Sequence, residues 1–233
     1  MLDRYYIKYA VAYIIGYLKK NNKTNLLPNN LLEKPLDLFD SEDFLSVLNL
    51  GEKLNVKLYH FKKTDRLLPR VNKTIGFLKS LYFESLLDVG SGRGVFLLPF
   101  LEEFPYVKVT SFDILDKRYE MLNNIALGGV ENLTVYKKDI CDGDILPKSV
   151  DVVTMLEVLE HIPNVKKAIE NAVKIAKQYV VVTVPSKEDD NPEHIHLLTK
   201  NLLTQYFNDA GVKKLSFDGV NGHLFMVAKI END

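Results

Sequence analysis

A glycine-rich turn between an apolar run and a helical segment constrains this chain more than any other feature of its sequence. The run SLLDV (85–89) leads into a Gly-x-Gly-x-Gly turn at 90–94, and a helical segment follows at 95–103. Glycines there let the backbone turn tightly and approach a ligand closely. The turn therefore predicts a strand–loop–helix unit with a ligand site. A dinucleotide fingerprint has Gly or Ala where this chain has Val95, which disfavours a nicotinamide oxidoreductase.

Apolar runs alternate with helical segments through the rest of the chain. Strands are expected at 85–89, 107–112, 133–136, 150–155, 179–184, 213–217 and 224–229, and helices at 95–103, 116–127, 165–177 and 199–210. This alternation predicts an α/β protein whose parallel sheet has right-handed crossovers. The last two strands have only 218–223 between them, too short for a crossover helix, so they are expected to be antiparallel. An open sheet of this kind binds ligands at the carboxyl ends of its strands.

The first 80 residues differ from the rest in pattern and in charge. Helices are expected from residue 5 to the Asn pair at 21–22 and at 41–49, 51–64 and 67–80. Residues 51–80 carry 8 basic and 2 acidic side chains, a face that suits a phosphate-bearing substrate or is simply solvated. We therefore expect residues 1–80 to form a helical extension or lid, and residues 81–233 to form a separate domain.

The composition disfavours several classes of protein. The apolar segment 5–18 contains Lys8 and is too short for a membrane span, which needs about 20 apolar residues. Its tyrosines recur every four residues, so we expect a helix that is buried or faces a partner. The formal net charge of −1 argues against a strongly basic nucleic-acid binder. A single cysteine, Cys141, excludes an intramolecular disulfide framework and fits a cytoplasmic location.

Three aspartates stand at or near the ends of the expected strands. Asp88, two residues before the first glycine, suits a ligand with a positive or hydrogen-donating group. Asp113 can accept hydrogen bonds from both hydroxyls of a ribose, or it can cap the helix that begins near residue 116. Asp139 can accept from the exocyclic amine of an adenine, with Ile140 packing on the ring, or be a plain loop residue.

A second group, Glu157-x-x-Glu160-His161, follows the expected fourth strand. Positions i, i+3 and i+4 share one face of a helical turn. Two carboxylates and an imidazole on one face can hold Mg²⁺ or Mn²⁺, can act as a general base with its orienting group, or can form structural hydrogen bonds. His194 and His196 follow the fifth strand at the same sheet edge, and we rank His194 first as a further ligand.

Together, the segments LLDVGSGRG, SFDI, KKDI and DVVTMLEVLEH resemble the class I S-adenosylmethionine (SAM)-dependent methyltransferases over residues 80–230. The resemblance implies a seven-stranded sheet of order 3-2-1-4-5-7-6, with helices on both faces and an antiparallel closing strand. SAM would bind across its carboxyl edge. The cofactor-binding residues would be Asp88, Gly90, Gly92, Gly94, Asp113, Ile114, Asp139 and Ile140.

The resemblance also implies three alternative functions. The favoured one is transfer of the SAM methyl group to an oxygen or nitrogen of a small-molecule acceptor, with His161, Glu160 and Glu157 as catalytic residues. The segment EVLEHIP resembles both ubiquinone-biosynthesis O-methyltransferases and small-RNA 2′-O-methyltransferases. In the RNA alternative, a divalent metal would bind Glu157, Glu160, His161 and His194. The third alternative is a SAM-binding module without catalysis. The sequence does not indicate the oligomeric state.

Overall fold

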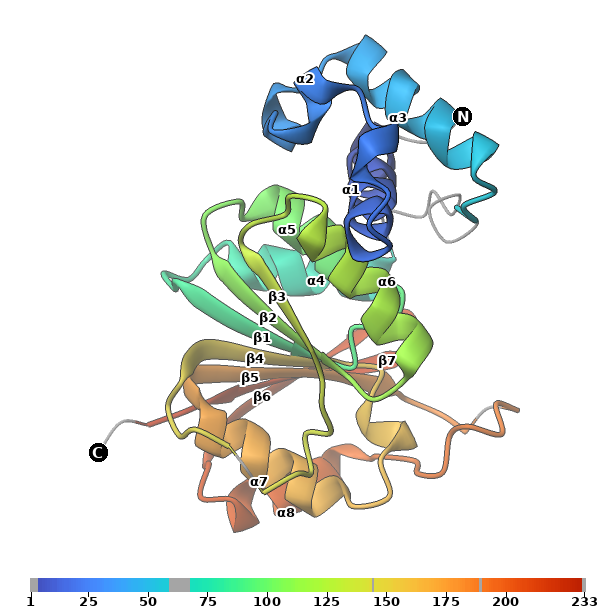
Figure 1. The fold of residues 1–233 in the computed structure, drawn as a ribbon. Helices are drawn as coiled ribbons and strands as arrows, with labels where there is room; N and C mark the ends of the chain where they lie inside the picture. The colour runs from blue at the N-terminus through green and yellow to red at the C-terminus, as the bar shows by residue number, and fades with distance from the viewer. Residues whose placement is uncertain (1–3, 59–67, 144, 189, 232–233) are drawn as a thin grey trace.

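The fold is a mixed sheet with helices on both of its faces (Figure 1). The structure is a computed structural model, and it describes residues 4–58, 68–143, 145–188 and 190–231. Helices α4 (Pro69–Leu78), α5 (Leu97–Glu103) and α6 (Asp116–Leu127) cover one face of the sheet. Helices α7 (Val165–Ile175) and α8 (Lys200–Asp209) cover the other. Each face has its own hydrophobic core.

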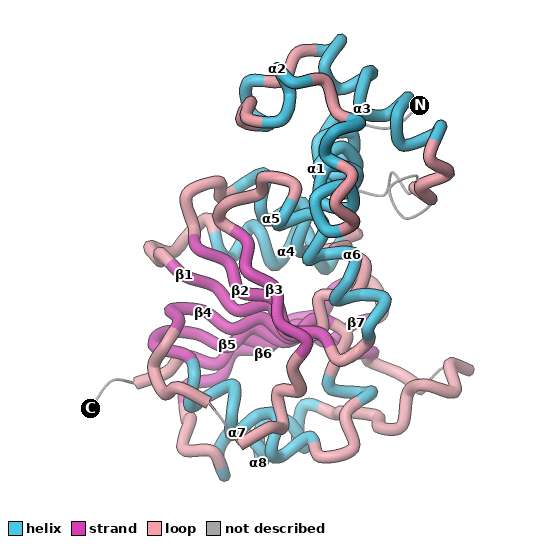
Figure 2. Tube along the Cα trace, viewed as in Figure 1, coloured by secondary structure: helices cyan, strands magenta, loops and turns pink. Residues whose placement is uncertain are grey.

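The sheet has seven strands in the order β3-β2-β1-β4-β5-β7-β6, which confirms the order that the family resemblance implied (Figure 2). The strands are β1 (Ser85–Val89), β2 (Lys108–Asp113), β3 (Leu133–Lys137), β4 (Val150–Leu156), β5 (Ala176–Pro185), β6 (Lys214–Val220) and β7 (His223–Lys229). Strands β1 to β5 pair in parallel, and β7 lies antiparallel to both β5 and β6. The carboxyl ends of the central strands therefore meet at one edge.

Two predicted helix boundaries are wrong. The expected helices 41–49 and 51–64 are replaced by one helix, α3 (Ser41–Lys53). Asp40 caps its first turn through a reciprocal capping box with Asp43, and the helix runs without a break to Lys53. Residues 59–64 of the expected helix, with the basic side chains at 59–67, lie outside the described residues. The expected helix 165–177 ends at residue 175 because Ala176 already pairs with β4.

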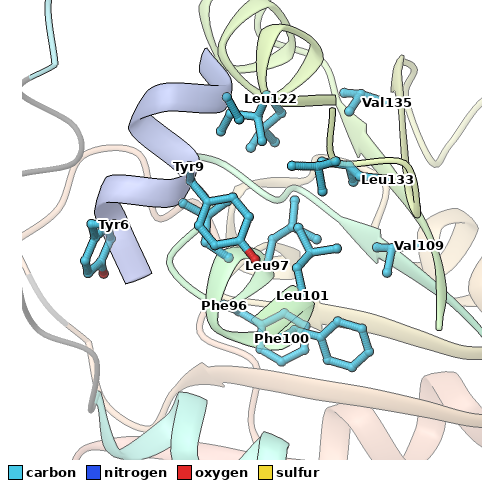
Figure 3. Packing of buried hydrophobic residues seen from close by; sticks show 14 of the residues in the cluster. Tyr6, Tyr9, Phe96, Leu97, Phe100, Leu101, Val109, Leu122, Leu133 and Val135 are labelled. Carbon is cyan, nitrogen blue, oxygen red and sulfur yellow. The ribbon is translucent and has the colours of Figure 1, made fainter. Parts of the chain in front are cut away.

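Helix α1 (Arg4–Lys20) packs on α6 and shares its core. Tyr9 is 1% exposed and lies against Leu97 and Leu101 of α5 (Figure 3). Of the two alternatives for this helix, the structure shows the buried one. The short helix α2 (Asn29–Leu32) and three 3₁₀ turns, at Thr24–Leu26, Leu36–Leu38 and Leu159–His161, complete the helical elements of the described ranges. None of the described helices is long and apolar enough to cross a bilayer.

Gly16 makes the close contact between α1 and α6 possible, and its substitution should be costly. A Cβ at Gly16 would lie 1.8 Å from the Asn124 carbonyl oxygen, so Gly16→Ala must push the two helices apart. We expect a loss of at least about 2 kcal/mol of unfolding free energy, measured by urea denaturation. Gly76→Ala in α4 is the control, because no atom lies within 4 Å of a Cβ there. It should stabilise the protein by about 0.5–1 kcal/mol, and equal effects would contradict the packing argument.

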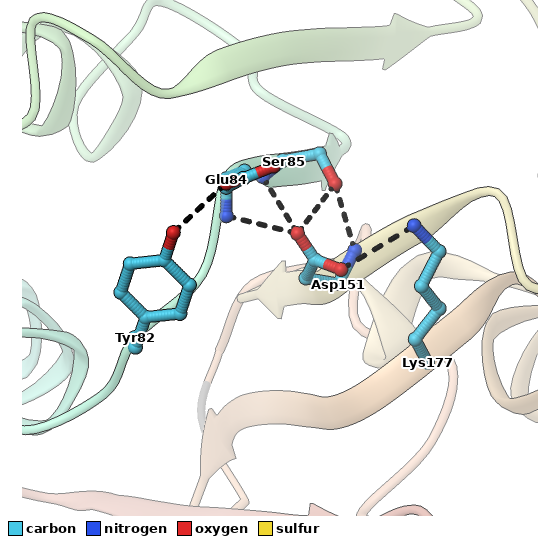
Figure 4. A network of polar contacts seen from close by, with 5 residues as sticks. All are labelled: Tyr82, Glu84, Ser85, Asp151 and Lys177. Atoms are coloured by element: carbon cyan, nitrogen blue, oxygen red, sulfur yellow. Dashed lines mark hydrogen bonds and ion pairs between the residues drawn. The ribbon is translucent and has the colours of Figure 1, made fainter.

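A polar network at the opposite, amino edge ties β1 to β4 (Figure 4). The Asp151 carboxylate accepts hydrogen bonds from the backbone N–H groups of Glu84 and Ser85 and from the Ser85 hydroxyl, at 2.8–3.0 Å. Its other oxygen lies 3.4 Å from Lys177 Nζ. Burial acts to raise the pKa of Asp151, but these donors outweigh burial and hold the pKa below its usual value. The network fixes the register of the two central strands whose far ends carry the site.

Candidate active site

A cavity of about 440 Å³ opens at the carboxyl edge of the central strands. Its volume lies within the range of small-molecule sites. It is lined by Val89, Gly90, Gly92, Phe112, Asp113, Ile114, Leu115, Arg118, Lys138, Asp139, Ile140, Glu157, Val158, His161, Ile162, Pro163 and Glu193. Six of the eight predicted cofactor residues are among them. Asp88 and Gly94 are not.

The three glycines of the turn have different roles. Gly90, Gly92 and Gly94 all have positive φ, at +65°, +57° and +75°, which favours glycine over any residue with a Cβ. A Cβ at Gly90 would lie 2.6 Å from Val158, and one at Gly94 would lie 2.7 Å from Leu98. A Cβ at Gly92 would meet only a backbone oxygen at 3.8 Å. Gly92 therefore exposes its backbone to the cavity, whereas Gly94 permits close packing of α5.

Asp113 connects the glycine turn to the start of α6. Its side chain is buried; Oδ2 accepts from the N–H of Gly92 and Oδ1 from the N–H of Leu115, both at 2.9 Å. Each carboxylate oxygen can accept two hydrogen bonds, so one position on each oxygen remains for a ligand. Helix α6 begins at Asp116 without a side-chain cap, so the helix-cap interpretation of Asp113 is wrong, whereas its remaining acceptor positions leave the ribose interpretation open.

Asp139 and Ile140 follow β3 and lie on the cavity wall. Asp139 Oδ1 accepts from the Cys141 N–H at 2.8 Å, which fixes the carboxylate in a local turn. Ile140 is 2% exposed, and its carbonyl oxygen accepts from Asn171 Nδ2 at 2.7 Å. Ile114, the residue after Asp113, is 58% exposed and also lines the cavity. The two isoleucines offer the apolar contacts that a purine ring requires.

Asp88 lies beneath the turn. Its Oδ1 accepts from the Thr154 hydroxyl at 2.7 Å, and the side chain is 2% exposed. Burial raises the pKa of Asp88 to about 6, against the hydrogen bonds from Ser91 and Thr154, which act to lower it. Asp88 therefore ionises less readily than an ordinary carboxyl, and it does not line the cavity.

Ionisation of Asp88 should cost stability. A carboxyl whose folded pKa is raised contributes most stability below its unfolded pKa, and this is lost as pH rises through the folded value. Asp88→Asn removes the ionisable group. Between pH 4 and pH 8, the unfolding free energy of the variant should therefore rise by about 2.5 kcal/mol relative to the parent chain. Urea denaturation across this range tests it, with the exposed Asp142→Asn as control. A pH-independent difference would contradict a raised pKa.

The predicted arrangement of Glu157, Glu160 and His161 on one helical face is wrong. Glu157 has a positive φ of +58°, and the helical turn that follows it is a short 3₁₀ turn, Leu159–His161. The chain therefore turns away between Glu157 and the other two. The Glu157 carboxylate contacts Thr183 of β5 and His223 of β7.

Glu160, His161 and His194 do come together. One ligand atom from each lies within 4.8 Å of the others. The imidazole rings of His161 and His194 meet edge to face, with their centroids 4.8 Å apart. His161 Nδ1 lies 2.8 Å from the Glu193 carbonyl oxygen. A carbonyl only accepts, so Nδ1 carries the proton and Nε2 keeps a lone pair. His161 lines the cavity, whereas Glu160 is fully buried behind it. His196 Nε2 instead lies 3.1 Å from the Ile162 carbonyl oxygen.

The methyltransferase domain family matches residues 54–217 of this chain. The chain belongs to the methyltransferase family. Solved structures agree on the fold. A SAM-dependent methyltransferase from Aquifex aeolicus aligns with a TM-score of 0.57 and 22% identity, over 78% of this chain and 96% of that one. A second, from Archaeoglobus fulgidus, aligns with a TM-score of 0.59 and 16% identity, over 78% and 98%. Family and fold together identify a class I SAM-dependent methyltransferase, as the sequence predicted.

Curated relatives cover less of the chain. The ubiquinone biosynthesis O-methyltransferase of Vibrio cholerae serotype O1 is 29% identical over 119 residues. The match includes 50% of this chain and 48% of that protein, so it spans about half the length of each.

The N-terminal helices of this methyltransferase stand apart from the cavity in the described structure. No described residue of 1–80 is among the cavity residues. Lys73 of α4, from the basic stretch, forms an ion pair with Asp218 of β6. The lid over the acceptor site stays a prediction.

Sequence reasoning missed Thr183, Glu193 and His223. Thr183 carries a weak signal, because it is a polar residue inside the β-branched run of β5. Glu193 acts through its backbone carbonyl, which leaves no mark in sequence. His223 is 66 residues from Glu157 in the numbering and reaches it only because β7 pairs with β5.

Proposed function

We propose that this methyltransferase transfers the methyl group of SAM to an oxygen or nitrogen of a small-molecule acceptor. One observation supports this most: a single cavity holds the Gly92 and Asp113 cradle together with the His161 imidazole. Gly92 and Asp113 would bind the cofactor, and the His161 imidazole would accept a proton from the methyl acceptor.

The residues present fit the cofactor. Gly92 leaves open space where a side chain would stand, and Asp113 retains acceptor positions for ribose hydroxyls. Asp139 and Ile140 supply an acceptor and an apolar wall for the adenine. When bound, SAM supplies an activated methyl group on a sulfonium leaving group. The protein's main task is then to orient the two reactants.

The acceptor needs a place for its proton. His161 presents a lone pair on Nε2 because Nδ1 is turned to the Glu193 carbonyl. The imidazole would take the proton from the acceptor hydroxyl or amine as a general base. In the metal version of this proposal, Glu160, His161 and His194 would hold Mg²⁺ or Mn²⁺, since their ligand atoms already lie together. Glu157 would not belong to that set.

The first test of the function is binding. Titration calorimetry with S-adenosylhomocysteine (SAH) should show heat, and NADH should show none. A screen with methyl-labelled SAM, before and after chelation and with Mg²⁺ or Mn²⁺ added back, then identifies the acceptor. Label in small molecules supports this proposal, whereas label in RNA supports the 2′-O-methyltransferase alternative. Binding of SAH without transfer to any acceptor would favour a non-catalytic module.

A further inference from the structure

Glu157 has an unusual backbone for a residue that lines the cavity. Among the described non-glycine residues of the wall, it alone has a positive φ, +58°. This conformation is costly for a residue with a Cβ. Such strain persists where the surrounding contacts hold it, and it clusters at functional sites. The contacts of Glu157 are therefore informative about its role.

Two neighbouring strands hold the Glu157 side chain and backbone. Its N–H donates to the Thr183 carbonyl oxygen at 2.9 Å. Its Oε1 accepts from the Thr183 hydroxyl at 2.8 Å, and Oε2 lies 2.9 Å from His223 Nε2. Thr183 is fully buried in β5, and His223 is the first residue of β7. The carboxylate is thus fixed at both oxygens.

His223 is itself held by the turn before β7. Its Nδ1 lies 3.0 Å from the carbonyl oxygen of Asn221, another residue with positive φ, +37°. A carbonyl and a carboxylate both only accept, so each contact requires an N–H on the imidazole: Nδ1–H donates to Asn221 and Nε2–H donates to Glu157. The turn between β6 and β7 therefore orients the His223 imidazole toward Glu157.

Glu157 stands beside the glycine turn. Met155, two residues earlier, pairs with Val89, and the neighbouring Val158 side chain occupies the space next to Gly90. Among the described cavity residues at 89–92 and 157–158, Glu157 carries the only charged side chain. Its side chain is 20% exposed, and each oxygen can accept a second hydrogen bond.

We propose that Glu157 accepts a hydrogen bond from the α-ammonium group of the methionine part of SAM, and that His223 is the positioning residue that acts through Glu157. This inference rests on the proposed function, because it requires SAM in the cavity. It adds a side-chain contact at the amino-acid end of the cofactor. The cavity residues of the glycine turn, Gly90 and Gly92, can offer only backbone groups there.

A comparison of two ligands tests the contact with the amino-acid end of the cofactor. SAH contains the amino-acid group, whereas 5′-methylthioadenosine shares the nucleoside and thioether but lacks it. In titration calorimetry, Glu157→Gln should weaken SAH binding about 10- to 100-fold, the usual loss for one charged hydrogen bond. Its affinity for 5′-methylthioadenosine should change less than threefold. Glu157→Gly gives a second variant, because glycine accepts the positive φ without strain while the carboxylate is removed. It should still fold, because relief of the backbone strain offsets part of the loss of the buried Thr183 hydrogen bond, and it should lose the same SAH affinity.

His223→Gln tests the positioning role. It should weaken SAH binding about three- to tenfold, and the double variant with Glu157→Gln should bind no worse than Glu157→Gln alone. Ser186→Ala is the control, because its hydroxyl donates to Gly222 in the same turn without touching Glu157. It should bind both ligands as the parent chain does.

The possible failures are distinct. A parent chain that binds neither ligand overturns the proposed function and this inference together. If the parent chain binds SAH, two results for Glu157→Gly overturn the inference alone. In the first, the variant binds SAH normally; in the second, it loses affinity for SAH and for 5′-methylthioadenosine equally. Additive losses for Glu157→Gln and His223→Gln overturn the positioning role.

Discussion

Gly92→Val is expected to abolish SAH binding, with a loss of more than about 100-fold in affinity. The Cβ of residue 92 would point into open cavity, where no described atom lies nearer than 3.8 Å. The two additional methyl groups of valine would then occupy the volume that the cofactor needs. They would also cover the backbone of the turn, whose N–H at Gly92 holds Asp113. Titration calorimetry with SAH measures the effect.

A matched glycine separates blocked binding from backbone strain. Gly211, after α8, has a positive φ of +89° and open space around its Cβ position, but it is not a cavity residue. Gly92→Val and Gly211→Val should each lose about 1–2 kcal/mol of unfolding free energy, because both force a β-branched residue into the left-handed region. Only Gly92→Val should lose SAH. Similar SAH affinities for the two variants would show that the turn does not border the cofactor.

The sheet was predictable because its signals are local. Strands β1, β4 and β5 contain apolar runs, whereas β2 and β3 alternate between buried and more exposed residues. The segments between β4 and β5 and before β6 are amphipathic helices. The strand order came from the family resemblance. The end of α7 was not predictable in this way, because pairing of Ala176 with Val150 overrides a helical pattern that runs on to residue 177.

The site was predictable where single residues follow strands. Asp113, Asp139 and their neighbours needed only the rule that carboxyl ends of parallel strands meet. The group at 157–161 failed because the spacing was interpreted as a helical turn, whereas one backbone with positive φ at Glu157 rotates that residue away. No sequence pattern marks a strained glutamate. Its partner His223 is recognised only after the antiparallel pairing is known.

His161→Ala is expected to lower kcat about 10²- to 10⁴-fold, the usual contribution of a general base. The imidazole lines the cavity, and its Nδ1 contact with the Glu193 carbonyl directs the Nε2 lone pair away from that contact. Because the Gly92 and Asp113 cradle is untouched, SAH affinity should change less than threefold. Turnover is measured with the acceptor that the labelling screen identifies, and SAH binding by calorimetry.

His196→Ala is the matched control, since this second loop histidine contacts the Ile162 carbonyl and is not a cavity residue. Its turnover should equal that of the parent chain. Mn²⁺ titration followed by electron paramagnetic resonance decides between the two roles of His161. If Glu160, His161 and His194 hold an ion, the parent chain binds Mn²⁺, and both His161→Ala and Glu160→Gln lose it. If the parent chain turns over after chelation and binds no Mn²⁺, His161 acts on the acceptor proton directly. Full turnover in His161→Ala would exclude both roles and leave the imidazole as a structural hydrogen-bonding group.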